Sequence, residues 1–389
     1  MEQKKLSRIS ALALNSIFGF EPKFSHSLID SLGSAEAVFL ISDRERLELF
    51  GPYTKYLARI NDSALDAAEK EYDRLTGEGY QILSIYDEEY PEVLRDCPDA
   101  PMALYMRSTQ PASAVFNREF GIAVVGTRDI SPYGREWCRR IVDAVSQAPK
   151  KPVIVSGMAL GVDITAHMQA LESGLATIGV LPVGIDDVYP RRHWGAAQKI
   201  AESPGSALVT DYPPGSTPSA VNFIRRNRII AGMSAATVLI ESKTKGGGMI
   251  TARLASSYGR EVFALPGRID DIRSQGCNQL IREKTAEPVT DLATLPGQLG
   301  LGVFNLRKKT DVAAAIRGRF SEIFDEKDLE RLVTIGLSIK KVRGASFDDL
   351  CRLTGMDYSD ISRCAGILES EGIISVDLLQ RCCINTNFQ

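Results

Sequence analysis

Six short apolar segments, rich in valine and isoleucine, alternate with helical patterns in the middle of the chain. Between the first two segments, Trp137, Cys138, Ile141, Val142 and Val145 recur at helical spacing, as expected of a helix that covers a sheet. Continuous apolar strands separated by helices predict a parallel sheet with both faces covered. We therefore expect an α/β fold with a Rossmann-like, doubly wound, mostly parallel sheet. The six segments are 122–126, 153–157, 176–181, 207–210, 237–241 and 262–266.

The chain has 389 residues, which predicts more than one domain. Its first part has apolar residues at helical spacing, and a stretch near residue 300 combines glycines with the basic cluster Arg307, Lys308 and Lys309. In the last part, helix, turn, helix and hairpin follow one another, and Ser346 stands three residues ahead of Asp349 as in a capping box. The expected parts are a helical domain of the SAM or helix-hairpin-helix kind (1–85), the Rossmann-like domain (86–290), a linker (291–318) and a winged-helix domain (319–389).

Composition narrows the class of protein. The seven cysteines include no C-x-x-C pair, so we expect neither a disulfide framework nor a metal site. No apolar run approaches the roughly 18 residues of a membrane span, and no signal peptide is recognisable at the start. We expect a cytoplasmic protein without membrane contact. The net charge of −3 is not that of a strongly basic nucleic-acid binder, but the middle region is more basic than the rest.

Glycine-containing turns follow several of the predicted strands. Gly126 and Arg128 follow the first strand, and a helix begins close by at Ser131. Three consecutive glycines, 246–248, precede another predicted helix. Glycine lets the backbone approach an anion, and the amides at the start of a helix favour negative charge. Because the carboxyl ends of parallel strands share one edge of a sheet, we expect these turns to form one anion-binding surface.

A loop rich in proline, glycine and serine leads into an aromatic residue and an arginine cluster. Phe223 is followed by Arg225, Arg226, Asn227 and Arg228. An aromatic ring can stack on a base while guanidinium groups follow the phosphates, which is typical of binding to single-stranded DNA. We expect binding that is nearly independent of sequence and strongly dependent on salt, and a homodimer that presents two such surfaces. The expected DNA-binding residues are Gly126, Arg128, Ser156, Gly157, Phe223, Arg225, Arg226, Asn227, Arg228, Gly247 and Thr251.

The order of these motifs resembles one known family. "VVGTRDISPYG", "SGMALGVDITAHMQAL", "FIRRNRIIAGMS", "GGGMITARLASSYGREVFALPG" and "GCNQLI" occur as in the DprA/Smf family of DNA-processing proteins. The resemblance covers roughly residues 90 to 290. It implies an extended Rossmann fold that binds single-stranded DNA, forms dimers, protects incoming DNA and promotes loading of the RecA recombinase in natural transformation or recombination. The chain departs from the family pattern at Leu160, where an arginine is usual, and at the triple glycine 246–248, where Ser-Gly-Ser is usual.

Two alternatives belong to other functional classes. The first is a nucleotide-processing enzyme, like the phosphoribohydrolases of the LOG family, but no glutamate follows the triple glycine at the spacing that their chemistry needs. Asp163 and His167 lie one helical turn apart and could act as acid and base, although a packed histidine is the favoured interpretation. The second is a duplex-DNA regulator, but the predicted recognition helix, 359–371, has one arginine, Arg363, against the acidic residues Asp360, Glu369 and Glu371. We therefore expect a protein without catalytic residues, metal or cofactor.

Overall fold

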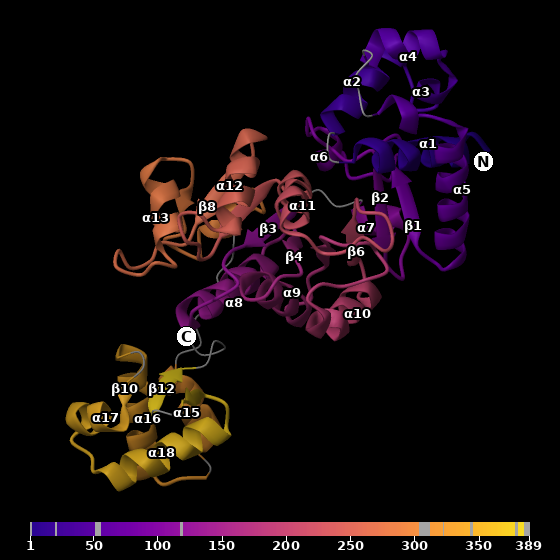
Figure 1. Ribbon diagram of the computed structural model, residues 1–389. Helices are drawn as coiled ribbons and strands as arrows, with labels where there is room; N and C mark the ends of the chain where they lie inside the picture. Colours follow the sequence, from indigo (N-terminus) through magenta and orange to yellow (C-terminus); the bar gives the residue numbers. More distant parts are fainter. Residues whose placement is uncertain are drawn as a thin grey trace. The chain divides into compact units, whose positions relative to one another are not determined.

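The computed structural model describes residues 2–19, 22–50, 56–116, 120–302, 312–321, 323–342, 345–377 and 380–384. The chain forms two compact units that divide between residues 304 and 305 (Figure 1). Each unit has its own apolar core. Among the described residues, no helix is both long enough and apolar enough to cross a bilayer.

The first unit is built on a sheet of nine strands in the order β1-β2-β6-β5-β4-β3-β7-β8-β9. Neighbouring strands from β6 to β9 run parallel, whereas β1 pairs with β2 and β2 with β6 in antiparallel fashion. The six predicted segments correspond to β3 to β8, so the prediction of a mostly parallel sheet is confirmed. The strands are β1 (Gln81–Ser84), β2 (Ala103–Arg107), β3 (Gly121–Val125), β4 (Val153–Gly157), β5 (Thr177–Val180), β6 (Ala207–Thr210), β7 (Ala236–Leu239), β8 (Glu261–Ala264) and β9 (Glu287–Pro288).

Helices cover both faces of this sheet. On one face, Cys138, Ile141, Val142 and Val145 of α8 are buried against the strands, as their spacing predicts. On the other face, α11 and α12 pack side by side and share a core with the N-terminal helices. The helices of the first unit are α1 (Glu2–Phe18), α2 (Pro22–Leu32), α3 (Ala37–Leu40), α4 (Asp43–Phe50), α5 (Asp62–Gly77), α6 (Glu92–Arg95), α7 (Ala112–Phe116), α8 (Pro132–Ser146), α9 (Val162–Glu172), α10 (Trp194–Glu202), α11 (Ala220–Gly232), α12 (Gly247–Ser257), α13 (Gln275–Arg282) and α14 (Leu295–Gln298), with 3-10 turns η1 (Leu57–Arg59) and η2 (Arg191–His193).

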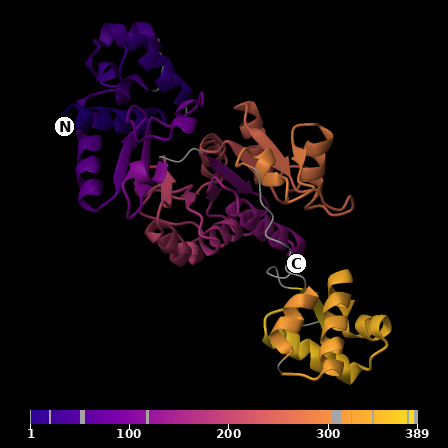
Figure 2. The same cartoon turned by 180° about the vertical axis from the view of Figure 1, so that it is seen from behind.

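The N-terminal helices do not form a core separate from the sheet. Residues 1–85, expected to be a helical domain, also contribute β1, which pairs with β2 at the sheet edge. Leu12 and Leu14 of α1 belong to the same core as Leu104 and Leu208 of the strands. In both views the N-terminal helices lie at the β1–β2 end of the sheet (Figure 1, Figure 2). The expected boundary at residue 85 is therefore corrected, because burial of apolar side chains continues across it.

The linker expected over 291–318 is also corrected. Leu295, Leu299 and Leu301 are buried in the core beneath α8, so this stretch completes the first unit. The helix α15 (Val312–Phe320) buries Val312, Ile316 and Phe320 in the core of the second unit. The glycines of this stretch indicate a linker, whereas the apolar side chains between them are buried. The basic cluster at 307–309 lies outside the described residues.

In its described residues, the second unit combines α15 with three more helices and a small antiparallel sheet in the order β10-β12-β11. The capping box predicted at Ser346 and Asp349 is present, and Asp357 caps the following helix. That helix buries Ile361, Cys364, Ala365 and Leu368, the face that its spacing predicts. The remaining elements are α16 (Glu326–Lys341), α17 (Phe347–Thr354), α18 (Tyr358–Ser370), β10 (Ala345–Ser346), β11 (Ile374–Val376) and β12 (Arg381–Ile384).

Candidate nucleic-acid interface

A cavity of about 640 Å³ opens at the carboxyl ends of the parallel strands. We call it the sheet-edge cavity. It lies between the loops that follow β3 and β7 and the helices α11 and α12. This is the place where a doubly wound sheet binds its ligands. The predicted site residues that line it are Gly126, Arg128, Phe223, Arg226, Asn227, Gly247 and Thr251.

An aromatic pair and an arginine stand together in this cavity. The guanidinium carbon of Arg128 lies 4.6 Å from the centre of the Phe223 ring. Tyr189 meets Phe223 edge to face, with ring centres 5.3 Å apart. The Arg128 side chain is exposed and the Phe223 ring is half-buried, so both are accessible from the cavity. Sequence reasoning missed Tyr189, although its place in a loop after a predicted strand was the available signal.

The helix α12 begins in the sheet-edge cavity without a side-chain cap. Gly246 is its N-cap residue and makes no capping hydrogen bond, and the next glycine, Gly247, has open space around it. Gly248 lies close to the backbone of Gly126, where a Cβ atom would lie 3.1 Å from its Cα. Uncapped amides at a helix start attract anions. Two exposed lysines, Lys243 and Lys245, line the cavity beside this start, and neither was among the residues predicted from the sequence.

The start of α8, by contrast, is closed to an external anion. The Glu241 carboxylate accepts hydrogen bonds from the Ser131 amide at 2.9 Å and from the Ser131 hydroxyl at 2.5 Å. The Ser131 hydroxyl in turn accepts the Gly134 amide at 3.0 Å. A Cβ atom at Gly134 would overlap the Glu241 carboxylate. The expectation that this helix start binds a phosphate is corrected, because a buried carboxylate of the chain already occupies it.

Arg226 forms part of the cavity wall rather than an exposed charge. Its side chain is buried, and Nη1 donates a hydrogen bond of 2.5 Å to the carbonyl of Val180. Burial lowers the pKa of this guanidinium to about 10. Burial also raises the pKa of the neighbouring Asp163 carboxyl to about 6, an effect that the charge of Arg226 opposes. The wall of the cavity therefore contains the positive charge of the Arg226 guanidinium together with the Asp163 carboxyl that compensates it.

Ser156 and Gly157 do not line the sheet-edge cavity. The Ser156 hydroxyl is buried and donates a hydrogen bond of 2.6 Å to the carbonyl of Val124. Gly157 is buried beneath the guanidinium of Arg226. The prediction that these two residues contact DNA directly is corrected. They support the cavity wall instead, because β4 ends below the cavity rather than at its surface.

The predicted arginine cluster divides between two sides of α11. Arg226 faces the sheet-edge cavity, whereas Arg225 and Arg228 line a different cavity. Arg228 is buried, forms an ion pair with the Asp211 carboxylate, and donates a hydrogen bond of 2.7 Å to the carbonyl of Asp99. The expectation that all three arginines follow one DNA backbone is corrected, because residues next to each other on a helix point in directions about 100° apart.

Asn227 connects the two helices of the cavity. The Asn227 side-chain amide donates a hydrogen bond of 3.5 Å to the carbonyl of Gly247 at the start of α12. Thr251 is buried one turn further along the same helix. Asn227 therefore orients the glycine turn at the start of α12.

His167 is not placed for acid–base chemistry. It is fully buried, with Nδ1 at 2.6 Å from the Thr177 hydroxyl and Nε2 at 3.1 Å from the carbonyl of Gly157. Burial lowers the pKa of its imidazole to about 4. Both ring nitrogens are engaged below the sheet-edge cavity, whereas Asp163 lines it. Within the described residues, no group of three or more histidine, cysteine, aspartate or glutamate side chains could hold a metal ion.

Known proteins resemble this chain over the region that forms the site. The sequence model of the family "DNA recombination-mediator protein A" matches residues 81–299. Protein Smf from Synechocystis sp. is 31% identical over 315 residues, which cover 76% of this chain and 78% of Smf. DNA processing protein DprA from Streptococcus pneumoniae is 37% identical over 227 residues, which cover 58% of this chain and 74% of DprA.

Two solved structures share the fold. The structure of DNA processing protein A from Streptococcus pneumoniae has a TM-score of 0.53 and 30% identity, and the match covers 69% of this chain and 94% of that protein. A structure of DNA processing protein A from Helicobacter pylori, which concerns that protein's single-stranded DNA binding mode, has a TM-score of 0.50 and 29% identity. That match covers 57% of this chain and 95% of the other.

Proposed function

The chain belongs to the DNA recombination-mediator protein A family, the DprA/Smf family, and on this premise we propose that its sheet-edge cavity binds single-stranded DNA without altering it chemically. The observation that carries the proposal is the Arg128 guanidinium over the Phe223 ring beside the uncapped start of α12. This arrangement offers an aromatic surface to a base and positive charge to the adjoining phosphates. Stacking on aromatic side chains is tolerant of base identity, so binding is largely independent of sequence.

We propose a part for each group in the cavity. Phe223 and Tyr189 stack against a base, and Arg128 binds the phosphate next to it with two parallel hydrogen bonds. The amides at Gly247 and Gly248 bind a second phosphate, with Lys243 and Lys245 adding charge. The buried Arg226, whose charge the neighbouring Asp163 opposes, forms part of the wall beneath these groups. None of these groups is arranged as a nucleophile with a base, which supports a binding role rather than an enzymatic one.

The proposed biological setting rests on membership of the family. We propose that the protein protects incoming single-stranded DNA in the cytoplasm and promotes loading of RecA recombinase in natural transformation or recombination. Support comes from the family's description as a recombination mediator and from relatives named DNA processing proteins. A homodimer would present two sheet-edge cavities to one strand and raise the effective concentration of the second site.

The second unit is proposed to be a winged-helix module that contacts protein rather than duplex DNA. Its helix α18 would be the recognition helix, but Arg363 there pairs with Asp328 at 3.0 Å. Arg331 pairs with Asp328 at 3.2 Å and with Asp360 at 3.4 Å. Arginines held in such pairs offer less charge to a phosphate backbone, which supports the protein-contact role.

Fluorescence anisotropy with labelled oligo-dT and a matched duplex, across a salt series, tests the main proposal. The wild type should prefer the single strand, and Arg128→Ala with Phe223→Ala should lose at least roughly tenfold in affinity, since each stacked base contributes about 1–3 kcal/mol. Arg74→Ala on α5, an exposed arginine outside the cavity, is the matched control. Equal binding by the double variant and the wild type would refute the proposal, and release of base from nucleoside monophosphates would favour the enzyme instead.

A further inference from the structure

A second cavity of about 690 Å³ lies between the N-terminal helix α2 and the helices α11 and α12. We call it the α2 cavity. Lys23 and Phe24 line it from α2, and Ile224, Arg225 and Leu254 line it from the opposite side. None of the motifs in the sequence points to it, because its two walls are about 200 residues apart in the chain.

The α2 cavity adjoins the sheet-edge cavity. Ile224 of α11 and Ile250 of α12 line both of them, so these two side chains form the ridge that separates the cavities. Ile224 is 51% exposed, so its side chain is accessible from both cavities. A ligand that extends beyond the sheet-edge cavity over this ridge enters the α2 cavity.

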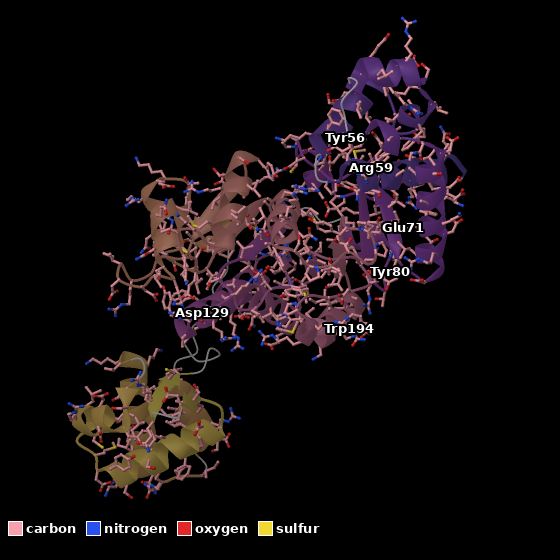
Figure 3. The ribbon with its side chains drawn as sticks, in the orientation of Figure 1. Tyr56, Arg59, Glu71, Tyr80, Asp129 and Trp194 are labelled. Atoms are coloured by element: carbon pink, nitrogen blue, oxygen red, sulfur yellow. The ribbon has the colours of Figure 1, made fainter. Side chains whose placement is uncertain are left out.

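The chemistry of the α2 cavity suits a base attached to a phosphate backbone. The Phe24 ring is held in place by Phe18, at 5.4 Å between ring centres, and by Tyr56, at 5.8 Å. Tyr56 lies with the N-terminal helices (Figure 3). A ring anchored in this way, with Ile224 opposite, provides an apolar slot for a flat aromatic group.

Positive charge dominates the polar groups of this cavity. Lys23 is exposed, and the partly buried Arg225 lines the same space. The carboxylate that lines it, Asp99, accepts hydrogen bonds of 2.7 and 2.9 Å from the Tyr258 hydroxyl, which offset part of its negative charge. This balance favours a polyanion over a neutral or acidic peptide.

We propose that the α2 cavity binds nucleobases of the same DNA strand that occupies the sheet-edge cavity, with Phe24 as the stacking residue. This inference rests on the proposed function and extends it. The strand crosses the Ile224–Ile250 ridge, its next base enters the slot beside Phe24, and its phosphates lie near Lys23 and Arg225. The N-terminal helices thereby form one wall of the DNA path and lengthen the site.

Oligo-dT of increasing length, from about four to about twelve nucleotides, separates the two cavities. Phe24→Ala removes the stacking ring, and Ser27→Trp fills the cavity with a side chain from the next turn of α2. Both variants should bind the short oligonucleotide as the wild type does, but lose roughly fivefold or more of the affinity gained with length. Ser63→Trp, on an exposed serine of α5 outside the cavity, is the matched control and should keep the full gain.

Cross-linking of the unmodified protein provides a readout that does not depend on variants. An oligonucleotide with 5-iodouracil at one position, moved along the strand, should cross-link to Phe223 from one position and to Phe24 from a later one. If the wild type and Arg128→Ala behave as proposed, but Phe24→Ala and Ser27→Trp match the wild type at every length and no cross-link reaches residues 22–32, this inference is wrong and the proposed function stands. If no oligonucleotide binds the wild type at low salt, the proposed function fails and this inference fails with it.

Discussion

The guanidinium of Arg226 fills the space in which a Cβ atom at position 157 would lie. Gly157 ends the strand β4, and Arg226 reaches it from α11 on the face of the sheet that carries the sheet-edge cavity. The absence of a side chain at Gly157 allows Arg226 to reach the carbonyl of Val180 and the neighbourhood of Asp163. One glycine therefore determines how charge is placed in the cavity wall.

Gly157→Ala should destabilise the first unit by roughly 2–4 kcal/mol, because the guanidinium must move and leave Asp163 buried with less compensation. Unfolding in urea can be followed by tryptophan fluorescence, since both tryptophans, Trp137 and Trp194, lie in the first unit. Gly195→Ala, where a Cβ atom has open space, is the control and should change stability by no more than about 1 kcal/mol. A stable Gly157→Ala protein would show that Arg226 relocates at little cost.

Arg228→Ala should lower the stability of the first unit, and not only its affinity for DNA. Removing Arg228 leaves the Asp211 carboxylate buried without its ion-pair partner, which costs about 3–5 kcal/mol. The exposed Arg128→Ala should cost less than about 1 kcal/mol in the same urea experiment. Adding Asp211→Asn to Arg228→Ala should restore part of the loss, because no unpaired charge is then buried. Equal stability of the two single arginine variants would contradict the buried pair.

Glu241→Gln tests the closed start of α8. The neutral glutamine side chain accepts hydrogen bonds from the backbone N–H and the hydroxyl of Ser131 less strongly than a carboxylate does. It also carries no charge to offset the helix dipole. We expect a loss of about 1–2 kcal/mol in stability. Glu261→Gln, on an exposed glutamate of β8, should be neutral. A neutral Glu241→Gln would show that the helix start is satisfied in another way.

Lys243→Ala and Lys245→Ala should each lower the salt dependence of binding to single-stranded DNA. A lysine that neutralises one phosphate contributes about 0.7 to the slope of log affinity against log salt for a single strand. The exposed Lys199→Ala on α10, which lies outside the cavity, should leave the slope unchanged. If the slope of log affinity against log salt equals the wild-type slope in all three variants, the start of α12 is not part of the DNA path.

The buried His167 should make the folded protein less stable in acid. Burial lowers the pKa of its imidazole from 6.5 to about 4, so the unfolded chain binds more protons within this window, and the group's contribution to stability is lost as the pH falls from about 6.5 towards 4. Asp163 has the opposite effect, since burial raises its pKa to about 6, but its contribution is the same in wild type and His167→Gln. Relative to the wild type, His167→Gln should therefore gain about 3 kcal/mol between pH 7 and pH 4. Parallel pH profiles of the two proteins would contradict the buried, neutral histidine.

Much of the fold could be predicted because its signals are local. Valine- and isoleucine-rich segments identified β3 to β8, and the spacing of Cys138, Ile141 and Val142 identified the face of α8 that is buried. The caps at Ser346 and Asp357 follow from side chains that reach amides three residues away. Parallel strands bring the turns that follow them to one edge, which correctly placed Gly126, Phe223 and Gly247 in one cavity.

The tertiary structure alone decided which of these groups a ligand can reach. Ser131 and Glu241 are 110 residues apart, and only their contact closes the start of α8 while α12 stays open. Likewise, the packing of α11 against the sheet sends Arg226 into the wall of one cavity and Arg228 to Asp211. A sequence pattern specifies the direction of a side chain relative to its own helix or strand. Whether that side chain meets solvent, a partner or another helix depends on elements distant in the chain, so accessibility is a property of the assembled fold.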